Sequence, residues 1–207
     1  PSKSQLLSFL LRKNMHAIQC QCGQLRAHVE GEGIHNHIVC YCSDCRAFAH
    51  FLGRAEQVLD AQGGTEIVQI SQARLRFIQG QEHLATVRLS DKGMVRWYAA
   101  CCKTPLGNIM PDPKMAFIGL IHSALDRKNI EKNFGPVTAW MEAQAAIGAP
   151  KPVQKGVLPV VLRFIRMSLG ARLSGSYKQS PLFNAEGQTI VKAEILTPTQ
   201  LNDLKNR

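Results

Sequence analysis

From about residue 15 to residue 120, the sequence alternates short apolar runs with glycines and polar turns. Runs of this length that contain β-branched and aromatic residues predict β-strands. Turn signals such as Gly63-Gly64 and Asp91-Lys92-Gly93 fall between the runs. The predicted strands cover residues 25–29, 34–40, 66–70, 75–78, 84–89, 94–98 and 116–120. This part of the chain is therefore expected to be mostly β-sheet.

After residue 122 the pattern becomes helical. Ser123 stands three residues before Asp126, as a helix N-cap would, and Gly135-Pro136 is a helix stop signal. A second helix is predicted over residues 137–147. We therefore expect a helical segment over residues 123–150.

Glycine and two prolines within residues 148–156 predict a linker. Residues 158–173 then form a helical run that is apolar on most sides. A helix in a membrane interface would segregate its polar face, so we expect this one to be mostly covered by protein. A last helix is predicted to begin with Thr197 as N-cap, Pro198 at the first position and Gln200 closing a capping box.

Together these elements predict a mainly β fold with a C-terminal helical extension, α+β overall. A chain of 207 residues is long enough to bury a substantial hydrophobic core. The predicted parts are an N-terminal helix or arm over 1–14, a β domain over 15–122, the helical segment over 123–150, and a basic C-terminal extension over 151–207.

The chain is basic, with 25 Lys and Arg against 15 Asp and Glu and a formal net charge of +10. Residues 151–207 hold nine basic and three acidic side chains, so much of the excess lies there. Such an excess attracts nucleic acid or acidic surfaces. However, no run of Lys or Arg exceeds two residues and aromatic residues make up only 6%, so no stacking platform for single strands is evident. Nucleic-acid binding stays an alternative.

No run of 18 apolar residues occurs, so no transmembrane segment is predicted. The apolar stretch 6–11 is followed by Arg12 and Lys13 and lacks a small-residue cleavage site, which makes it a poor signal peptide. We therefore expect a cytoplasmic protein, in which cysteines stay reduced and serve a purpose other than disulfide formation.

All seven cysteines lie within the predicted β domain, in three groups: Cys20 and Cys22; Cys40, Cys42 and Cys45; Cys101 and Cys102. Clustered cysteines in a reducing compartment are more often zinc ligands than buried free thiols. Residues two apart on a strand face the same side, so each of the first two groups can grip one ion, and the tight turn to Cys45 adds a further ligand. The spacings match neither common ferredoxin run, which disfavours an iron–sulfur cluster.

Cys40, Cys42 and Cys45 form a set of three potential zinc ligands within one short segment. A structural zinc takes four protein ligands, whereas a catalytic zinc takes three and keeps one position for water or substrate. If the other cysteines lie too far away to complete this set, the site is open and these three cysteines are its catalytic residues.

The histidines add two candidates. His16 is in phase with Cys20 and is kept as a ligand candidate, although a lone histidine at a strand start is more often an ordinary core or surface residue. His50 follows the three-cysteine segment and is a candidate proton carrier, although a loop histidine is more often merely exposed. His35 and His37 are out of phase with the cysteines of their strand and are expected to face away.

Three stretches carry a family resemblance: C-Q-C-G-Q-L-R from Cys20, C-Y-C-S-D-C-R from Cys40, and R-W-Y from Arg96 with C-K-T-P-L-G from Cys102. Over about residues 15–120 they resemble the glutathione-dependent formaldehyde-activating enzyme (GFA/CENP-V) family. The resemblance implies a β-tent, Mss4-like fold with two zinc sites. One is structural, built from the first C-x-C and a late C-x-x-C, and the three-cysteine site is catalytic. The implied activity is that of a carbon–sulfur lyase that condenses formaldehyde with glutathione.

The sequence departs from this family at the late pair. The family reads C-x-x-C-G-T, and this chain reads Ala99-Ala100-Cys101-Cys102-Lys103-Thr104. Alignment on Thr104 makes Cys102 the preferred ligand and displaces Cys101. Adjacent residues usually point apart, so a shared ion would need an unusual backbone. The structural site is therefore expected to be rearranged around Cys101, completed by a histidine, or empty, and the chain to belong to an uncharacterised branch.

Two functions follow for a chain that binds one or two Zn²⁺ ions. In the first, a small thiol such as glutathione is deprotonated at the three-cysteine zinc and adds to a carbonyl, or the reverse step cleaves a C–S bond. Arg46 would then hold a carboxylate of the thiol, although a structural role is the commoner one for such an arginine. In the second, the chain is a non-catalytic zinc-binding module for a protein or nucleic-acid partner. The sequence does not give the oligomeric state.

Overall fold

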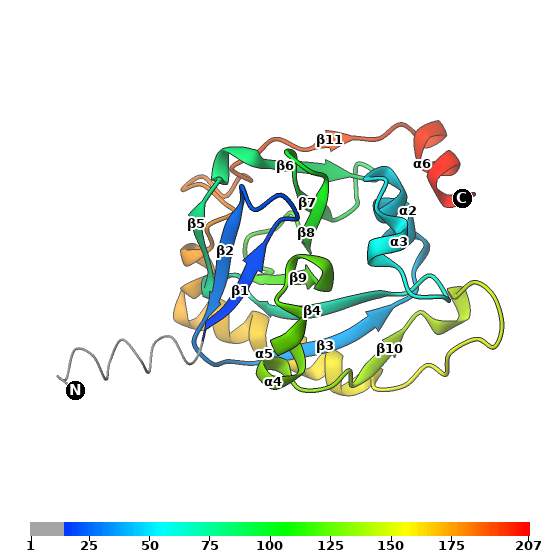
Figure 1. Cartoon of the computed structure of the whole chain (residues 1–207). Coiled ribbons are helices and arrows are strands. Elements are labelled where there is room, and N and C mark those ends of the chain that lie inside the picture. The colour runs from blue at the N-terminus through cyan, green and yellow to red at the C-terminus, as the bar shows by residue number, and fades with distance from the viewer. Residues whose placement is uncertain (1–14) are drawn as a thin grey trace.

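A computed structural model describes residues 15–207 as two β-sheets bordered by helices (Figure 1). The predicted N-terminal helix or arm over 1–14 lies outside the described residues. The smaller sheet has the order β1 (Met15–Gln19), β2 (Arg26–Glu30), β5 (Leu75–Gln79). The larger sheet has the order β10 (Ala139–Met141), β3 (His35–Cys40), β4 (Thr65–Ser71), β9 (Phe117–Ile121), β8 (Thr104–Ile109), β7 (Val95–Ala99), β6 (Leu84–Arg88), β11 (Glu194–Ile195).

Most neighbouring strands are antiparallel, and the two edge strands of the larger sheet, β10 and β11, pair in parallel with β3 and β6. The α-helices of the described residues are α2 (Ser43–Phe51), α3 (Ala55–Val58), α4 (Ile130–Phe134), α5 (Val157–Ser174) and α6 (Pro198–Lys205). The predicted fold class is confirmed: the protein is mainly β with a C-terminal helical extension, α+β overall.

The main core fills the space between the two sheets. Strand β1 alternates exposed and buried residues, so Ile18 points inward while its neighbours face solvent. The central strands β7, β8 and β9 are buried at every position, because elements cover both of their faces. On one face the smaller sheet packs against Trp97, and on the other α2 packs through Phe48 against Ile121.

Each of the seven predicted strands exists, and no strand end differs from the prediction by more than one residue. Strands β1, β8, β10 and β11 were not predicted from the sequence. The predicted helix over 137–147 is wrong, because this stretch forms β10 and a single 3-10 turn over Ala143–Ala145. The backbone N–H of Thr138 donates to the carbonyl of His37, which starts the parallel pairing with β3. The free edge of β3 therefore outweighs the local helical pattern.

The first helix predicted in the segment 123–150 is shorter than expected and differently capped. It covers Ile130–Phe134, and Gly135 with φ of 69° ends it as predicted. The predicted N-cap Ser123 is wrong, since Asp126 accepts from the N–H of Lys128 at the start of the preceding 3-10 turn. The capping box of α6 is confirmed, with Thr197 and Gln200 bonding reciprocally.

The region predicted as a C-terminal extension contributes to the same body. Strand β11 joins the larger sheet, Leu182 is fully buried in the main core, and α6 packs on α2. Helix α5 contradicts the expectation that it is mostly covered, because one of its apolar faces is exposed. Among residues 15–207, no helix combines the length and apolarity needed to cross a bilayer.

Candidate metal centres

The first cluster of thiols joins the two sheets. Cys20 and Cys22 lie in the turn between β1 and β2, and Cys101 and Cys102 lie in the turn between β7 and β8. Their four Sγ atoms lie within 4.8 Å of one another. This set, the four-thiol cluster, brings together side chains 79 and 81 positions apart in the chain.

The sulfur spacing of the four-thiol cluster fits one zinc ion. Zinc–sulfur bonds of about 2.3 Å in a tetrahedron require sulfurs about 3.8 Å apart. The Sγ atom of Cys101 lies 3.8 Å from that of Cys20, 3.3 Å from that of Cys22 and 3.8 Å from that of Cys102. The backbone N–H of Leu25 donates to Cys20 Sγ at 3.2 Å, which favours the thiolate. Ligand number and spacing match a structural zinc site.

The β7–β8 turn shows how two adjacent cysteines reach one point. The N–H groups of Cys102 and Lys103 donate to the carbonyl of Ala99, and Lys103 takes a left-handed φ of 57°. This coil turns Cys101 and Cys102 toward the same side, which an extended backbone would not do. Of the three expected alternatives, the geometry corresponds to rearrangement around Cys101, and no histidine of residues 15–207 joins either cluster.

The thiols of the four-thiol cluster differ in acidity. Burial raises the pKa of Cys20, and burial with the neighbouring thiols raises that of Cys101. Burial also opposes ionisation of Cys102, but hydrogen bonds, first of all with the Thr104 hydroxyl at 3.1 Å, outweigh it and lower the pKa of Cys102 to about 6. A divalent cation would allow these thiols to be thiolates together.

The second cluster comes from one short segment where β3 passes into α2. Cys40 ends β3, Cys42 is the N-cap residue of α2, and Cys45 lies in the first helical turn. Their Sγ atoms lie within 4.8 Å of one another, with 3.2 Å between Cys42 and Cys45. Among residues 15–207, no further Cys, His, Asp or Glu adds a ligand atom to this three-thiol cluster. Three donors are the ligand count of a catalytic zinc site.

The sequence predicted that Cys20 and Cys22, and likewise Cys40 and Cys42, converge because each pair shares one face of a strand. The pairs do converge, but this reason is wrong. Cys20 and Cys22 lie beyond the end of β1, and Cys42 lies beyond the end of β3, so neither pair shares one face of a strand. Turn geometry gathers the first pair. The start of α2, where the N–H of Cys45 donates to the carbonyl of Cys42 at 3.1 Å, gathers the second.

The three-thiol cluster packs against apolar side chains, and a buried cation lies near it. Its apolar neighbours are Ile38, Ile67, Ala139, Met141 and Val160. The cation is Arg96 of β7, which is 3% exposed and has its guanidinium 5.5 Å from the Phe48 ring. Its Nη1 donates to Asn108 at 3.3 Å and its Nη2 lies 3.9 Å from Asp44. The positive charge favours thiolates nearby.

One thiol of the three-thiol cluster ionises far more readily than its neighbours. Hydrogen bonds from Cys40 and Cys45, helped by the charge of Arg96, lower the pKa of Cys42. Correspondingly, the hydrogen bond with Cys42 raises the pKa of Cys40 to about 12, and that of Cys45 is raised chiefly by Cys40. Without a metal, the neighbouring thiols therefore oppose ionisation of Cys40 and Cys45, and a bound cation would favour all three as thiolates.

Arg46 and His50 both lie on α2. Arg46 Nη1 donates to the backbone carbonyls of Tyr41 and Ala145, at 2.8 Å each, so it ties the start of α2 to the chain after β10. Its predicted role in holding a carboxylate stays a prediction. His50 stands in the last turn of α2, where burial lowers its pKa. A role for His50 as a proton carrier likewise stays a prediction.

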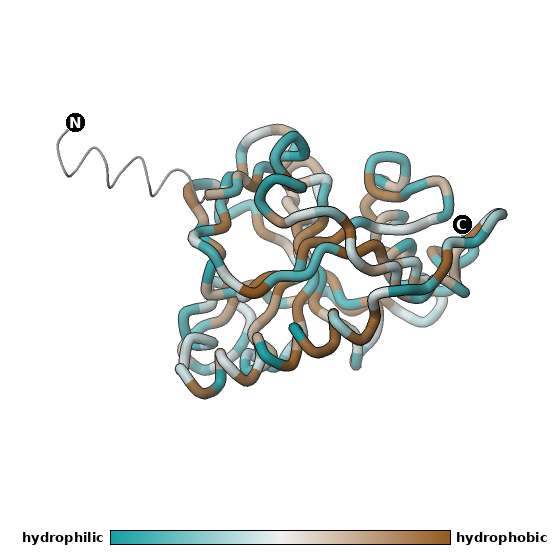
Figure 2. The backbone as a smooth tube through the Cα atoms, turned by 90° about the horizontal axis from the view of Figure 1, so that it is seen from below, coloured by the Kyte–Doolittle hydropathy of each residue, from teal (hydrophilic) through white to brown (hydrophobic). Residues whose placement is uncertain are grey.

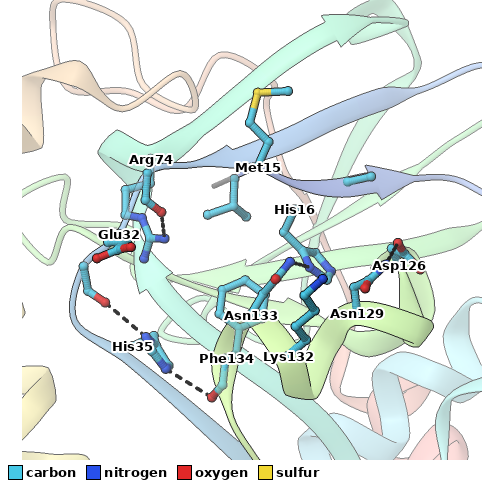
Figure 3. Close-up of a pocket in the computed structure, with 14 residues that line it drawn as sticks. Met15, His16, Glu32, His35, Arg74, Asp126, Asn129, Lys132, Asn133 and Phe134 are labelled. Atoms are coloured by element: carbon cyan, nitrogen blue, oxygen red, sulfur yellow. Dashed lines mark hydrogen bonds between the residues drawn. The ribbon is translucent and has the colours of Figure 1, made fainter. Parts of the chain in front are cut away.

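His16 lies apart from both clusters, in the wall of a cavity of about 680 Å³ (Figure 3). Its Nδ1 lies 2.8 Å from the side-chain amide nitrogen of Asn133, and its ring packs edge-on against Phe134. Arg74 and Asp126 also line this cavity. The side chain of His16 therefore packs in the cavity wall and contributes no ligand to the four-thiol cluster.

Sequence reasoning did not assign a role to Arg96 or to the hydroxyl of Thr104. Arg96 is the charged residue of a predicted strand, and Thr104 is two residues from Cys102. An arginine within a buried strand is itself a signal, because an unpaired charge is costly to bury.

Comparisons with known proteins give a family without a known activity. The profile described as "Family of unknown function (DUF6151)" matches residues 13–195. No functionally curated protein matches the sequence. Among solved structures, a structural-genomics crystal structure of a Rhodobacter sphaeroides protein is 19% identical, and the similarity covers 60% of this chain and 99% of that chain with a TM-score of 0.41.

Proposed function

The chain belongs to the family of unknown function DUF6151, and from this premise we propose that it is a zinc enzyme acting on a thiol adduct. The observation that carries the proposal is the unequal donor count of the two clusters. Four thiols complete a tetrahedral site, whereas three leave one position to a ligand from outside the protein. The four-thiol cluster is then structural, and the three-thiol cluster binds substrate.

The residues around the three-thiol cluster suit an anionic sulfur ligand. A zinc ion held there would lower the pKa of an incoming thiol and keep the thiolate beside its reaction partner. Three thiolate donors make such a site soft, which favours sulfur over water as the added ligand. Arg96 offsets part of the negative charge that the thiolates bring together, since its guanidinium is buried beside them.

The substrate class follows from the resemblance to the formaldehyde-activating family. We propose a glutathione-type thiol that adds to an aldehyde such as formaldehyde. The S–H bond breaks, an S–C bond forms, and the proton ends on the former carbonyl oxygen. The reverse reaction cleaves the C–S bond, so the enzyme would be classed as a carbon–sulfur lyase.

Metal analysis combined with a thiol titration tests this proposal. The purified chain is expected to hold two zinc ions. Cobalt(II) exchanged into the protein reports on sulfur ligation by its absorption spectrum, and glutathione is expected to change the spectrum of the wild type. The Cys42→Ser variant should hold one ion and show no response to glutathione. Formaldehyde consumption with glutathione, followed by NMR, tests the reaction itself.

The competing function is a non-catalytic zinc module for a protein or nucleic-acid partner. Two bound zinc ions with a cobalt spectrum that glutathione does not change would support this module. Absence of zinc in protein purified without chelators would contradict both functions.

A further inference from the structure

The exposed face of α5 is a surface feature that the zinc chemistry leaves unused. Six aliphatic side chains of this 18-residue helix are 41% to 89% exposed: Leu158, Val161, Leu162, Ile165, Leu169 and Leu173. At 100° per residue they form one stripe about 120° wide along the whole helix. The opposite side, with Val160, Met167 and Ala171, is buried against the protein. Figure 2 shows apolar positions recurring along α5, at the lower edge of the view.

A continuous aliphatic stripe of this length is unusual on a surface that faces water, because exposed apolar patches usually mark an interaction site. The described residues contain no helix able to cross a bilayer, so the stripe is not part of a membrane span. Within residues 15–207 nothing covers the stripe.

The charges on α5 indicate which occupant fits the stripe. The helix carries Arg163, Arg166 and Arg172 and no acidic residue. Arg166 lies at one border of the stripe and Arg163 lies further round the helix on the same side. Arg172 lies within the stripe near its C-terminal end, where its Nε donates to the carbonyl of Lys114. A second copy of the chain packed on this stripe would bring arginines against arginines, which is unfavourable. A surface that is apolar and negatively charged fits both features.

A cavity beside α5 supports the same occupant. It has a volume of about 290 Å³, and Arg163 and Arg166 line it together with His35, His37 and Thr138. Two guanidinium groups at the wall of a cavity next to an apolar stripe suit the phosphate of a lipid headgroup, with the acyl chains under the stripe.

We propose that α5 is an in-plane anchor that binds the surface of a membrane containing anionic phospholipid. The stripe enters the boundary between headgroups and acyl chains, and the arginines contact lipid phosphates. This inference does not depend on the zinc chemistry. It assigns the apolar face of α5 to a lipid surface and not to protein.

Vesicle flotation with the full chain tests the proposal. We compare phosphatidylcholine vesicles with vesicles that also contain phosphatidylserine. The chain is expected to bind the second kind about tenfold or more tightly, and less so at high salt. The variant Leu162→Gln/Ile165→Gln/Leu169→Gln should bind at least about tenfold more weakly than wild type. All three side chains are exposed, so the variant should keep the wild-type melting temperature.

Two matched variants sharpen this test. Ile78→Gln/Ile195→Gln changes exposed isoleucines on β5 and β11, outside the stripe, and should bind as wild type does. Arg163→Gln/Arg166→Gln should lose most of the preference for phosphatidylserine, whereas Lys92→Gln/Lys128→Gln, on exposed turns, should keep it.

Three outcomes would overturn the proposal. One is a wild-type chain that does not bind either kind of vesicle. Another is equal binding by the stripe variant and its isoleucine control. The third is a wild-type dimer, seen by sedimentation without lipid, that the stripe variant converts to a monomer, because the stripe would then belong to a second copy.

Discussion

The two thiol clusters differ most in the length of chain that each one joins. The four-thiol cluster links the β1–β2 turn to the β7–β8 turn, across about 80 positions of sequence, and thereby ties the smaller sheet to the larger one. The three-thiol cluster links residues of a single segment, Cys40 to Cys45, whose backbone β3 and α2 already hold.

This difference has an energetic consequence. Closing a long loop costs more conformational entropy than closing a short one, so a crosslink between distant residues stabilises the folded state more. A metal ion in the four-thiol cluster therefore acts mainly on stability. The ligands of the three-thiol cluster lie within six residues, so the unfolded chain can bind an ion there as well, and that ion adds less to the stability of the folded state.

The largest effect is expected from Cys22→Ser, which removes one ligand of the four-thiol cluster at an exposed position. Zinc bound only by the folded state contributes its binding free energy to folding. We expect the free energy of unfolding to fall by more than about 3 kcal/mol. Thermal unfolding and zinc content measure it.

The matched control is Cys42→Ser, which also replaces one thiol by a hydroxyl. A loss of stability in Cys42→Ser as large as that in Cys22→Ser would break the distinction between the two clusters.

A loss of thiol binding without a large loss of stability is the second expected effect, again in Cys42→Ser. Cys42 is the N-cap of α2 and makes no side-chain capping hydrogen bond, and serine is a favourable N-cap residue. Because these closely spaced thiols can also bind the ion in the unfolded chain, the free energy of unfolding should change by only about 1 kcal/mol. Isothermal titration with glutathione should show binding to the wild type and none to this variant. Binding that survives would place the thiol elsewhere.

The third expected effect is a loss of zinc affinity when either Cys101 or Cys102 is replaced. The sequence makes Cys102 the preferred ligand and displaces Cys101, whereas the structure places the sulfur of Cys101 next to those of Cys20 and Cys22. We expect Cys101→Ala and Cys102→Ala each to lower zinc affinity by at least about tenfold. Competition with a chelating dye measures both. Wild-type affinity in Cys101→Ala would restore the interpretation from alignment.

The smallest expected effect is a pH dependence of stability that comes from His37 on β3. Burial of His37 lowers its pKa, but the hydrogen bonds to Glu66 at 2.8 Å and to the Gly135 carbonyl at 2.7 Å outweigh it, and the pKa is raised. A raised histidine pKa stabilises the fold fully below pH 6.5, and this contribution is lost as pH rises through the folded-state value.

Glu66, the acidic partner of His37, limits the stability that this pair contributes at low pH. The hydrogen bond from His37 lowers the pKa of Glu66, so its share is present above pH 4.5 and is lost as pH falls through the folded-state value. His37→Gln should therefore lose about 1 kcal/mol near pH 5.5, a modest amount because Glu66 is partly exposed. The loss should be smaller near pH 9, where His37 is neutral in the folded protein. Urea unfolding at both pH values checks this. An equal loss at the two pH values would contradict the role of the pair.

Much of the fold follows from local sequence pattern. Alternating apolar residues located seven strands, and the capping box at Thr197 marked the start of α6. These features are local because strand and cap geometry depend on residues only a few positions apart. The grouping of cysteines into short motifs likewise brought out both sets of candidate ligands.

The tertiary structure decided what pairing with distant residues controls. Residues 139–141 form a strand because β3 offers a free edge, and short apolar segments follow such an edge against their own helical pattern. Arg96 lies beside the three-thiol cluster because β7 is a central strand covered by α2. These contacts join residues far apart in the chain, so no local sequence pattern predicts them.

The sequence by itself determined which residues can bind metal and that α5 is a helix with apolar side chains on most sides. Only the tertiary structure decided that Cys101 completes the four-thiol cluster, through the left-handed Lys103, and that Leu162 and its neighbours face outward. The physical reason is the same in both cases. Periodicity fixes how side chains point relative to one another, and the packing of distant segments decides which direction meets protein and which meets solvent.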